Sequence, residues 1–325
     1  MFRTELHPAP LPHKIRLNDS VLTIGSCFSD TIGKQLAQHK FSTLINPFGA
    51  VYNPISIHRL IGWSLKNQMP DESGYAQRDD VHFHYDFHSQ FAALSVNHLK
   101  ESLRHALALT HSFLQHTNWL MITYGTTWVY RLKSADRIVA NCHKMPGRLF
   151  AKELLSQKKI IKSFDALYHP LKSKHPNVHI LLTVSPVRHI RDTLELNSVS
   201  KSVLRLACHT ICTAYPDVHY FPAYEILLDD LRDYRFYASD LIHPSEQAED
   251  YVWQKFTEAC MDENTRSFIA EWRSIRQALM HRPFLPGSQS HRRFIEDTIR
   301  RLKELSSVVN VKNEIEALKN QLHEP

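Results

Sequence analysis

The stretch SVLTIGSCFSDTIG, residues 20–33, runs from a short apolar segment into a glycine and then into two adjacent nucleophilic side chains. Most of its first residues are β-branched or aliphatic, which predicts a buried strand that ends at Gly25. A helical pattern starts at Asp30. Ser26 and Cys27 therefore occupy a strand-to-helix turn, and this turn is the first candidate for a reactive site.

Strands and helices alternate through most of the chain. Helices are expected at 29–40, 54–66, 97–117, 150–174 and 198–215, where Pro170 could break the fourth. Further strands are expected at 41–49, 118–125, 178–186 and 218–223, with a strand or hairpin at 81–95 and a hairpin at 126–142. This alternation predicts right-handed crossovers and a three-layer α/β sandwich around a mainly parallel sheet. In such sheets the carboxyl ends of the strands face the ligand crevice.

The chain of 325 residues is long enough for one large α/β domain and an appendage. We expect an N-terminal extension at 1–19, the α/β domain at 20–260, and a helical extension at 261–325, where the strand signal disappears. Apolar residues of the last helical pattern are enough to dock it on the domain or to form a homo-oligomer through the C-terminal helices. These residues are Val311, Ile315, Leu318 and Leu322.

Composition favours a soluble globular protein, with 43% apolar and 22% charged residues. No apolar run reaches the length of a bilayer span, and the first residues lack the features of a secretory signal, so we expect a cytoplasmic protein without a membrane partner. Five cysteines without a Cys-x-x-Cys pair predict free thiols. The net charge of +6 is spread along the chain and interrupted by acidic residues, which argues against a nucleic-acid partner.

Three of the eight glycines, Gly25, Gly49 and Gly125, follow predicted apolar strands. Glycine at such a position permits a sharp turn and lets backbone N–H groups approach a ligand, which suits a nucleophile turn and an oxyanion hole. Glycine also serves ordinary strand-to-helix turns, and the sequence leaves both interpretations open.

A second motif is ASDLIHPSEQAE, residues 238–249, in which Asp240 precedes His243 by three positions. A carboxylate in the same loop can orient an imidazole, select its tautomer and stabilise its protonated form while the ring accepts a proton from a nucleophile. Alone, this pattern is more typical of a surface loop than of a catalytic pair. Together with the earlier strand-end motifs it predicts a nucleophile and a base on one sheet edge.

The order of these motifs resembles that of the SGNH hydrolase superfamily, whose blocks run in the same order on a flavodoxin-like sheet. The local sequences resemble the GSCFA-domain family, a bacterial branch of that superfamily, over roughly residues 20–257. The resemblance implies a Ser- or Cys-type acyl hydrolase or acyl transferase, with Asp240 and His243 in the catalytic block. The motifs that carry it are TIGSCFSDTIG (23–33), NPFGAVYNP (46–54), NCHK (141–144), LTVSPVRH (182–189) and the segment 220–248.

The chain departs from the superfamily in two blocks. An ungapped comparison with the usual Gly-Asp-Ser places Cys27 at the nucleophile position, and a shift of one residue places Ser26 there. The third block has Gly125-Thr126-Thr127 where the superfamily offers Gly-x-Asn, so the asparagine donor of the oxyanion hole is missing. Thr127, Asn53 and Asn141 are the candidates to replace it.

Other polar motifs lie outside these blocks. HFHYDFH, residues 82–88, could supply metal ligands, but four in-line ligands span too far for one ion, and a substrate-facing polar strand is the favoured interpretation. His143, Arg188 and His189 are expected at the crevice. Arg188 could clamp a substrate carboxylate or phosphate, or form an ion pair with Asp192.

The sequence thus favours an acyl-ester hydrolase or acyl transferase, with His243, oriented by Asp240, deprotonating Cys27 or Ser26. Backbone N–H groups near the nucleophile and at Gly49 would stabilise the oxyanion. The expected partner is a small-molecule or carbohydrate ester, and no metal or other cofactor is required. The alternative is a catalytically inactive protein that binds a carbohydrate or acyl ligand on the same fold. The acyl group, the alcohol and the choice between hydrolysis and transfer are undefined by the sequence.

Overall fold

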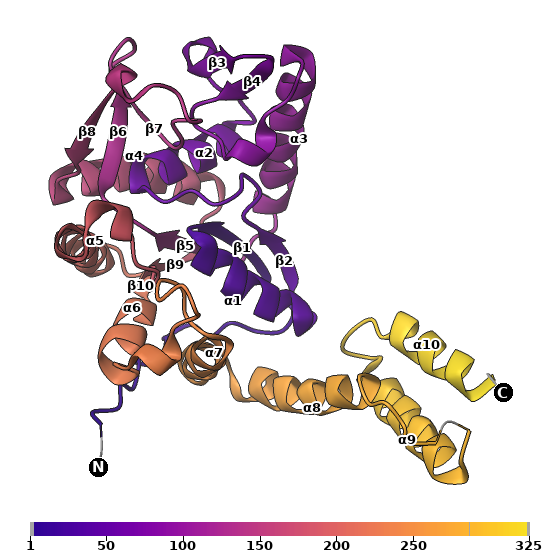
Figure 1. Ribbon diagram of the computed structural model, residues 1–325. Helices are drawn as coiled ribbons and strands as arrows, with labels where there is room; N and C mark the ends of the chain where they lie inside the picture. Colours follow the sequence, from indigo (N-terminus) through magenta and orange to yellow (C-terminus); the bar gives the residue numbers. More distant parts are fainter. Residues whose placement is uncertain (1–2, 286, 324–325) are drawn as a thin grey trace.

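A computed structural model describes residues 3–285 and 287–323 of the chain (Figure 1). Its centre is a five-stranded parallel sheet in the order β10-β9-β5-β1-β2. Numbered along the chain, the five parallel strands have the order 2-1-3-4-5, which is the flavodoxin-like arrangement. The strands are β1 (Ser20–Gly25), β2 (Ser42–Ile45), β5 (Trp119–Tyr124), β9 (His179–Val184) and β10 (Val218–Tyr220).

Helices cover both faces of this sheet, and the alternation of side chains along each strand separates two cores. On β1, Leu22 and Ile24 pack into the core beneath α2 to α5, whereas Val21 packs with α1 and α7. The protein is therefore the three-layer α/β sandwich that the alternation predicts. The helices are α1 (Cys27–Gln38), α2 (Pro54–Lys66), α3 (Val96–Leu114), α4 (Gln157–Lys174), α5 (Leu194–Ala214) and α7 (Glu246–Cys260), with a short α6 (Ala223–Glu225) after β10.

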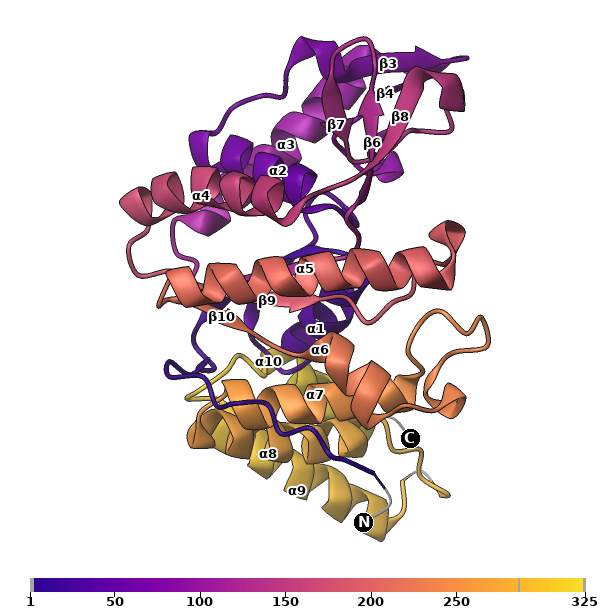
Figure 2. The same cartoon turned by 90° about the vertical axis from the view of Figure 1, so that its left-hand side faces the viewer.

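Two small antiparallel sheets lie beyond the α2–α4 layer, away from the central sheet (Figures 1 and 2). One is the hairpin of β3 (Tyr75–Arg78) and β4 (Val81–His84), and the other pairs β6 (Trp128–Leu132) with β7 (Arg137–Val139) and β8 (Phe150–Leu154).

The expected helix at 150–174 is wrong in its first turn. Residues 150–154 form β8, since they pair with the full length of β6, and the helix begins only after the cap Ser156. Pro170 lies inside α4 without ending it. Leu167 and Leu171, on either side of this proline, are buried and hold the helix on the core.

Three further helices, α8 (Glu263–Leu279), α9 (Gln289–Leu305) and α10 (Lys312–His323), project from α7 beside the sandwich (Figure 1). Val311 and Leu318 are buried in the same apolar cluster as α1 and α7, with Ile315 and Leu322 packed against it. Trp272 donates its indole N–H to the Gln38 carbonyl at 2.7 Å. The last helices thus pack on their own chain.

Within the described residues, no helix is long and apolar enough to cross a membrane.

Candidate functional site

The turn after β1 is shaped by Gly25. Its N–H donates to Asn46 Oδ1 at 2.8 Å, and its carbonyl accepts from the Val51 N–H at 2.8 Å. A Cβ at this position would lie 2.1 Å from the Thr123 carbonyl oxygen, and the φ of +143° is one that L residues rarely adopt. Only glycine lets β1 approach β5 this closely and then turn into α1.

Ser26 and Cys27 occupy different environments in this turn. Ser26 is fully buried and is the N-cap of α1, where its Oγ accepts the Phe28 N–H at 3.3 Å. Cys27 is the first residue of the helix and is only partly buried. Of the two candidates, Cys27 is therefore the more accessible, and Ser26 has a structural role in starting the helix.

The Cys27 thiol is held in its neutral form. Burial raises its pKa above the usual 9.0, and the charge of Asp30 raises it further. The N–H groups of Cys27 and Phe28 at the helix N-terminus act in the opposite direction. Attack by this sulfur consequently requires a base that removes its proton.

The structure adds Lys201, which the sequence motifs did not single out. This lysine lies on α5, is 1% exposed, and donates to the carbonyls of Gly125 at 2.8 Å and Ser185 at 2.7 Å. Both carbonyls follow the carboxyl ends of β5 and β9. Burial lowers the Lys201 pKa to about 7, an effect that the charge of Cys27 opposes. A titratable cation therefore lies within electrostatic range of the candidate nucleophile.

A local signal for Lys201 exists in the sequence. It falls on the same helical face as Leu204, Cys208 and Ile211, all of which are fully buried. A lysine on such an apolar face is unfavourable for packing, which indicates that it has a role other than packing.

His189 connects the nucleophile turn to the histidine loop. Its ring packs edge-on to Tyr52 with centroids 5.3 Å apart, and the charge of Cys27 acts on the Tyr52 hydroxyl. Burial lowers the His189 pKa to about 4, and the charges of Lys201 and His243 lower it as well. His189 is thus a neutral imidazole between the nucleophile turn and the loop of Asp240 and His243, and its buried Nε2 has no hydrogen-bond partner among the described residues.

Asp240 and His243 form the expected pair. His243 donates from Nδ1 to Asp240 Oδ2 at 2.7 Å, while the other carboxylate oxygen accepts the N–H groups of Ile242 and His243 at 2.9 and 3.0 Å. The His243 N–H, the imidazole and the Ile242 N–H lower the Asp240 pKa to about 2. Since Nδ1 donates, Nε2 is left to accept a proton.

Arg188 holds the loop that carries this pair. Its guanidinium lies 4.0 Å from the Tyr237 ring centroid and 5.2 Å from that of Tyr234, and it donates to the Leu241 carbonyl at 3.3 Å. The alternative ion pair with Asp192 is not formed, because Asp192 pairs with Lys152.

Most of the expected oxyanion donors already form hydrogen bonds to other protein groups. The Gly49 N–H donates to the Asn46 carbonyl at 2.8 Å, and the Gly125 N–H donates to the Tyr52 carbonyl at 2.8 Å. Thr127 Oγ1 contacts Ser200 Oγ at 3.1 Å. Asn53 caps α2 and donates to Val139 O at 3.3 Å. The Gly49 N–H and the Asn53 side chain, which we expected as oxyanion donors, thus already form intramolecular hydrogen bonds.

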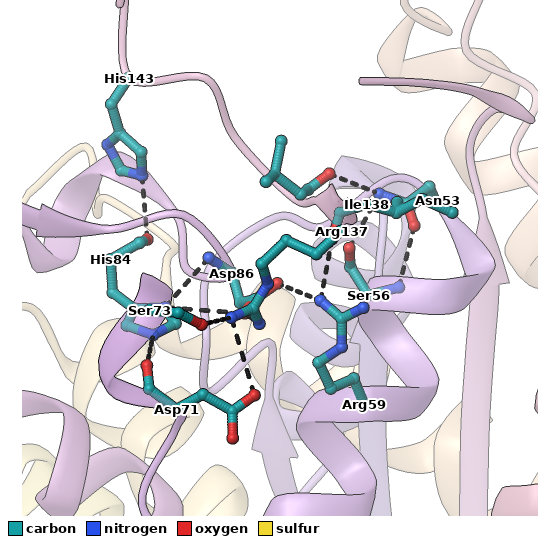
Figure 3. A network of polar contacts seen from close by, with 11 residues as sticks. Asn53, Ser56, Arg59, Asp71, Ser73, His84, Asp86, Arg137, Ile138 and His143 are labelled. Atoms are coloured by element: carbon teal, nitrogen blue, oxygen red, sulfur yellow. Dashed lines mark hydrogen bonds and ion pairs between the residues drawn. The ribbon is translucent and has the colours of Figure 1, made fainter. Parts of the chain in front are cut away.

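His143 belongs to a separate network that includes the buried carboxylate of Asp86 (Figure 3), and Asn141 is joined to this network through His143. Asn141 Oδ1 accepts the His143 N–H at 2.8 Å, and His143 Nε2 lies 3.1 Å from the carbonyls of His84 and Phe87. Burial lowers the His143 pKa to about 4. Through these bonds, Asn141 and His143 hold the connection between β7 and β8 against the segment at the end of β4 and after it.

Asp86 itself is fully buried and forms ion pairs with Arg59 of α2 and Arg137 of β7. This arrangement ties the small sheets to the helical layer (Figure 3). The expected substrate-facing strand at 82–88 is wrong beyond His84, where β4 ends, because Asp86 lies in the turn that follows. His84 and Asp86 both contact protein groups. Among the described residues, no group of three or more His, Cys, Asp or Glu side chains could hold a metal ion.

Comparison with known families agrees with this architecture. A family model described as the GSCFA family matches residues 20–256. The chain belongs to the GSCFA family. A second model, described as the GSCFA domain protein C-terminal domain, matches residues 272–324, so the helices of the GSCFA tail, α8 in part with α9 and α10, also have counterparts in relatives.

A search of the curated proteins found no match to this GSCFA chain. Among solved structures, one similar protein is a carbohydrate esterase family 3 from Talaromyces cellulolyticus. The two share 8% sequence identity with a TM-score of 0.35, over 78% of this chain and 99% of the other.

Proposed function

We propose that this GSCFA protein is an acyl-ester hydrolase or acyl transferase that forms a thioester on Cys27. The observation that carries the proposal is the partly buried thiol at the N-terminus of α1, within electrostatic range of the buried Lys201, on the sheet edge that His189 links to the Asp240–His243 pair.

In the proposed reaction, His243 Nε2 accepts the Cys27 proton as the sulfur attacks the ester carbonyl. The resulting oxyanion lies near the N-terminus of α1, whose dipole and first N–H groups favour negative charge. Collapse breaks the carbon–oxygen bond of the ester, and the imidazolium returns the proton to the departing alcohol. Water then attacks the thioester to release the acid and restore the thiol, or an acceptor hydroxyl takes the acyl group.

Asp240 stabilises the imidazolium that forms on His243, and its low pKa keeps it ionised throughout. Lys201 in its ammonium form favours the thiolate of Cys27, since the two charges attract. The two residues thus support the base and the nucleophile, respectively.

The test is mass spectrometry of the intact protein seconds after mixing with p-nitrophenyl acetate, with peptide mapping of the adduct. We expect one acetyl group on Cys27 in the wild type and in Ser26→Ala, and none in Cys27→Ala. Cys142→Ala is the matched control, because Cys142 is also partly buried but its pKa is raised to about 11 by burial.

The decisive variant is His243→Ala, in which rapid acetylation of Cys27 should be lost. Acetylation that persists at the wild-type rate in this variant, or that is scattered over lysines in all proteins, would contradict the proposal.

A non-catalytic protein that binds a carbohydrate or acyl ligand is the second candidate. It is favoured by the hydrogen bonds that already occupy Gly49, Asn53 and Thr127, which leave few donors for an oxyanion. This candidate predicts no acetyl adduct on Cys27 in any variant.

A further inference from the structure

A cleft lies beside the loop that carries His243. Its volume is about 400 Å³, and it is lined by Arg188 and by residues from the segment 228–237. This cleft is separate from the nucleophile turn, and the proposed chemistry does not use its side chains.

The cleft presents an aromatic face that is held in place. The Tyr234 side chain is 60% exposed, whereas Tyr237 is 8% exposed, and their ring centroids are 5.8 Å apart. The Arg188 guanidinium lies over both rings, at 5.2 Å and 4.0 Å. Cation–π contacts of this kind fix the rings before any ligand binds, so that little side-chain freedom is lost on binding.

The charges around the aromatic face balance. The lining contributes two carboxylates, those of Asp229 and Asp233, and two guanidinium groups, those of Arg188 and Arg232. Asp233 also pairs with Arg235, outside this lining, at 3.1 Å. A site with this balance has no preference for an anionic or cationic ligand, in contrast to a phosphate or polyamine site. It offers acceptors and fork-shaped donors to hydroxyl groups, which are themselves both donors and acceptors.

A flat apolar face surrounded by donors and acceptors matches the chemistry of a neutral sugar ring. The C–H face of a pyranose can cover Tyr234, because aromatic rings carry a negative face that favours polarised C–H groups. The ring hydroxyls then meet the carboxylates and guanidinium groups of the rim.

The cleft is directly connected to the proposed catalytic loop. The Arg188 N–H donates to the Ile242 carbonyl and its side chain donates to the Leu241 carbonyl, each at 3.3 Å. These two residues immediately precede His243. A sugar bound over Tyr234 would consequently place its substituents next to the loop of the general base.

We propose that this cleft is a saccharide subsite, built around Tyr234 and Arg188, that binds the neutral sugar part of the ester substrate. The catalytic consequence rests on the function proposed above, but binding of the sugar does not. The inference therefore specifies the alcohol component of the ester as a carbohydrate hydroxyl.

Binding is tested with xylotriose, chitotriose and maltotriose, by saturation-transfer NMR and calorimetry on the full-length wild type, Tyr234→Ala and Phe284→Ala. Phe284 is the matched control, because it is a fully exposed aromatic residue in the connection between α8 and α9. We expect at least one trisaccharide to bind, with its Kd raised about tenfold by Tyr234→Ala and unchanged by Phe284→Ala. Absence of binding for all three, or equal affinity in Tyr234→Ala and wild type, would overturn the subsite.

A kinetic comparison separates the subsite from the proposed chemistry. Tyr234→Ala should raise KM for acetylated forms of the trisaccharide that binds, whereas Phe284→Ala should leave this KM unchanged. Sugar binding without any Cys27 adduct would support the subsite and refute the enzymatic proposal. A Cys27 adduct that forms at the expected rate without any sugar binding would support the enzymatic proposal and refute the subsite.

Discussion

Replacement of Lys201 by methionine removes the buried ammonium group and retains most of the side-chain volume. In the folded protein the Lys201 pKa falls from 10.5 to about 7, mainly because of burial. The unfolded chain therefore binds more protons at Lys201 than the folded protein between these two pH values, and the stability of the wild type rises with pH across this window.

The magnitude follows from the shift. At pH 6 the lowered pKa of Lys201 corresponds to a loss of about 5 kcal/mol of folding free energy, and at pH 9 to a loss of about 2 kcal/mol, so the wild type gains about 3 kcal/mol over this interval. Lys201→Met lacks this dependence. Its loss of two hydrogen bonds, to the carbonyls of Gly125 and Ser185, costs about 1–3 kcal/mol each at both pH values.

The difference between the unfolding free energies of Lys201→Met and the wild type should accordingly change by about 3 kcal/mol between pH 6 and pH 9. Relative to the wild type, the variant should be more stable at pH 6 than at pH 9. Urea denaturation followed by tryptophan fluorescence measures it. Lys255→Met is the matched control, because Lys255 is also buried but is paired with Glu5. Burial lowers the Lys255 pKa, but the contacts with Glu5 and Tyr251 together raise it above its usual value, so the amine stays protonated.

The same variant reports on the nucleophile. Since the Lys201 charge lowers the Cys27 pKa, Lys201→Met should slow alkylation of Cys27 by iodoacetamide at neutral pH. A stability difference that is the same at pH 6 and pH 9 would refute the assignment of Lys201 as a neutralised buried amine.

Three further predictions concern the turn, the histidine pair and the buried network. Gly25→Ala should cost at least about 3 kcal/mol in urea denaturation, because its Cβ would overlap the Thr123 carbonyl, whereas Gly62→Ala, with open space in α2, should stabilise by about 0.5–1 kcal/mol. Asp240→Asn should slow acetylation of Cys27 about 100-fold or more at neutral pH without loss of the folded circular dichroism spectrum, and an unchanged rate would exclude the pair from catalysis. Asp86→Asn should cost about 3–5 kcal/mol, because Arg59 and Arg137 lose their buried partner, whereas Asp136→Asn at an exposed pair should cost under about 1 kcal/mol; equal thermal unfolding of the two variants would contradict this.

Local patterns in the sequence are sufficient to predict most elements of the sandwich. The run before Gly25 is mostly apolar, with Val21, Leu22 and Ile24, because β1 is buried on both sides. The helix at 54–66 begins with a proline after a capping asparagine. The Asp240–His243 pair is predictable for the same reason, since three residues of a single loop bring the carboxylate to the ring.

Other features of the fold and of the candidate site depend on tertiary contacts. Residues 150–154 contain alanine, lysine, glutamate and leucine, which favour a helix, but pairing with β6 makes them a strand. The distinction between Ser26 and Cys27 depends on the register at which α1 begins, because one residue of shift exchanges the buried cap and the partly exposed thiol.

Lys201 shows most clearly what sequence patterns cannot predict. The sequence places it on a helix, yet only the packing of α5 across β5 and β9 brings its ammonium group to two strand-end carbonyls and to the turn more than a hundred and fifty residues earlier in the chain. Sequence periodicity reports which face of an element is apolar, because that depends on neighbours three or four positions away. Which polar groups of distant elements share a buried volume, and hence how their charges and pKa values are coupled, is set by the assembled fold.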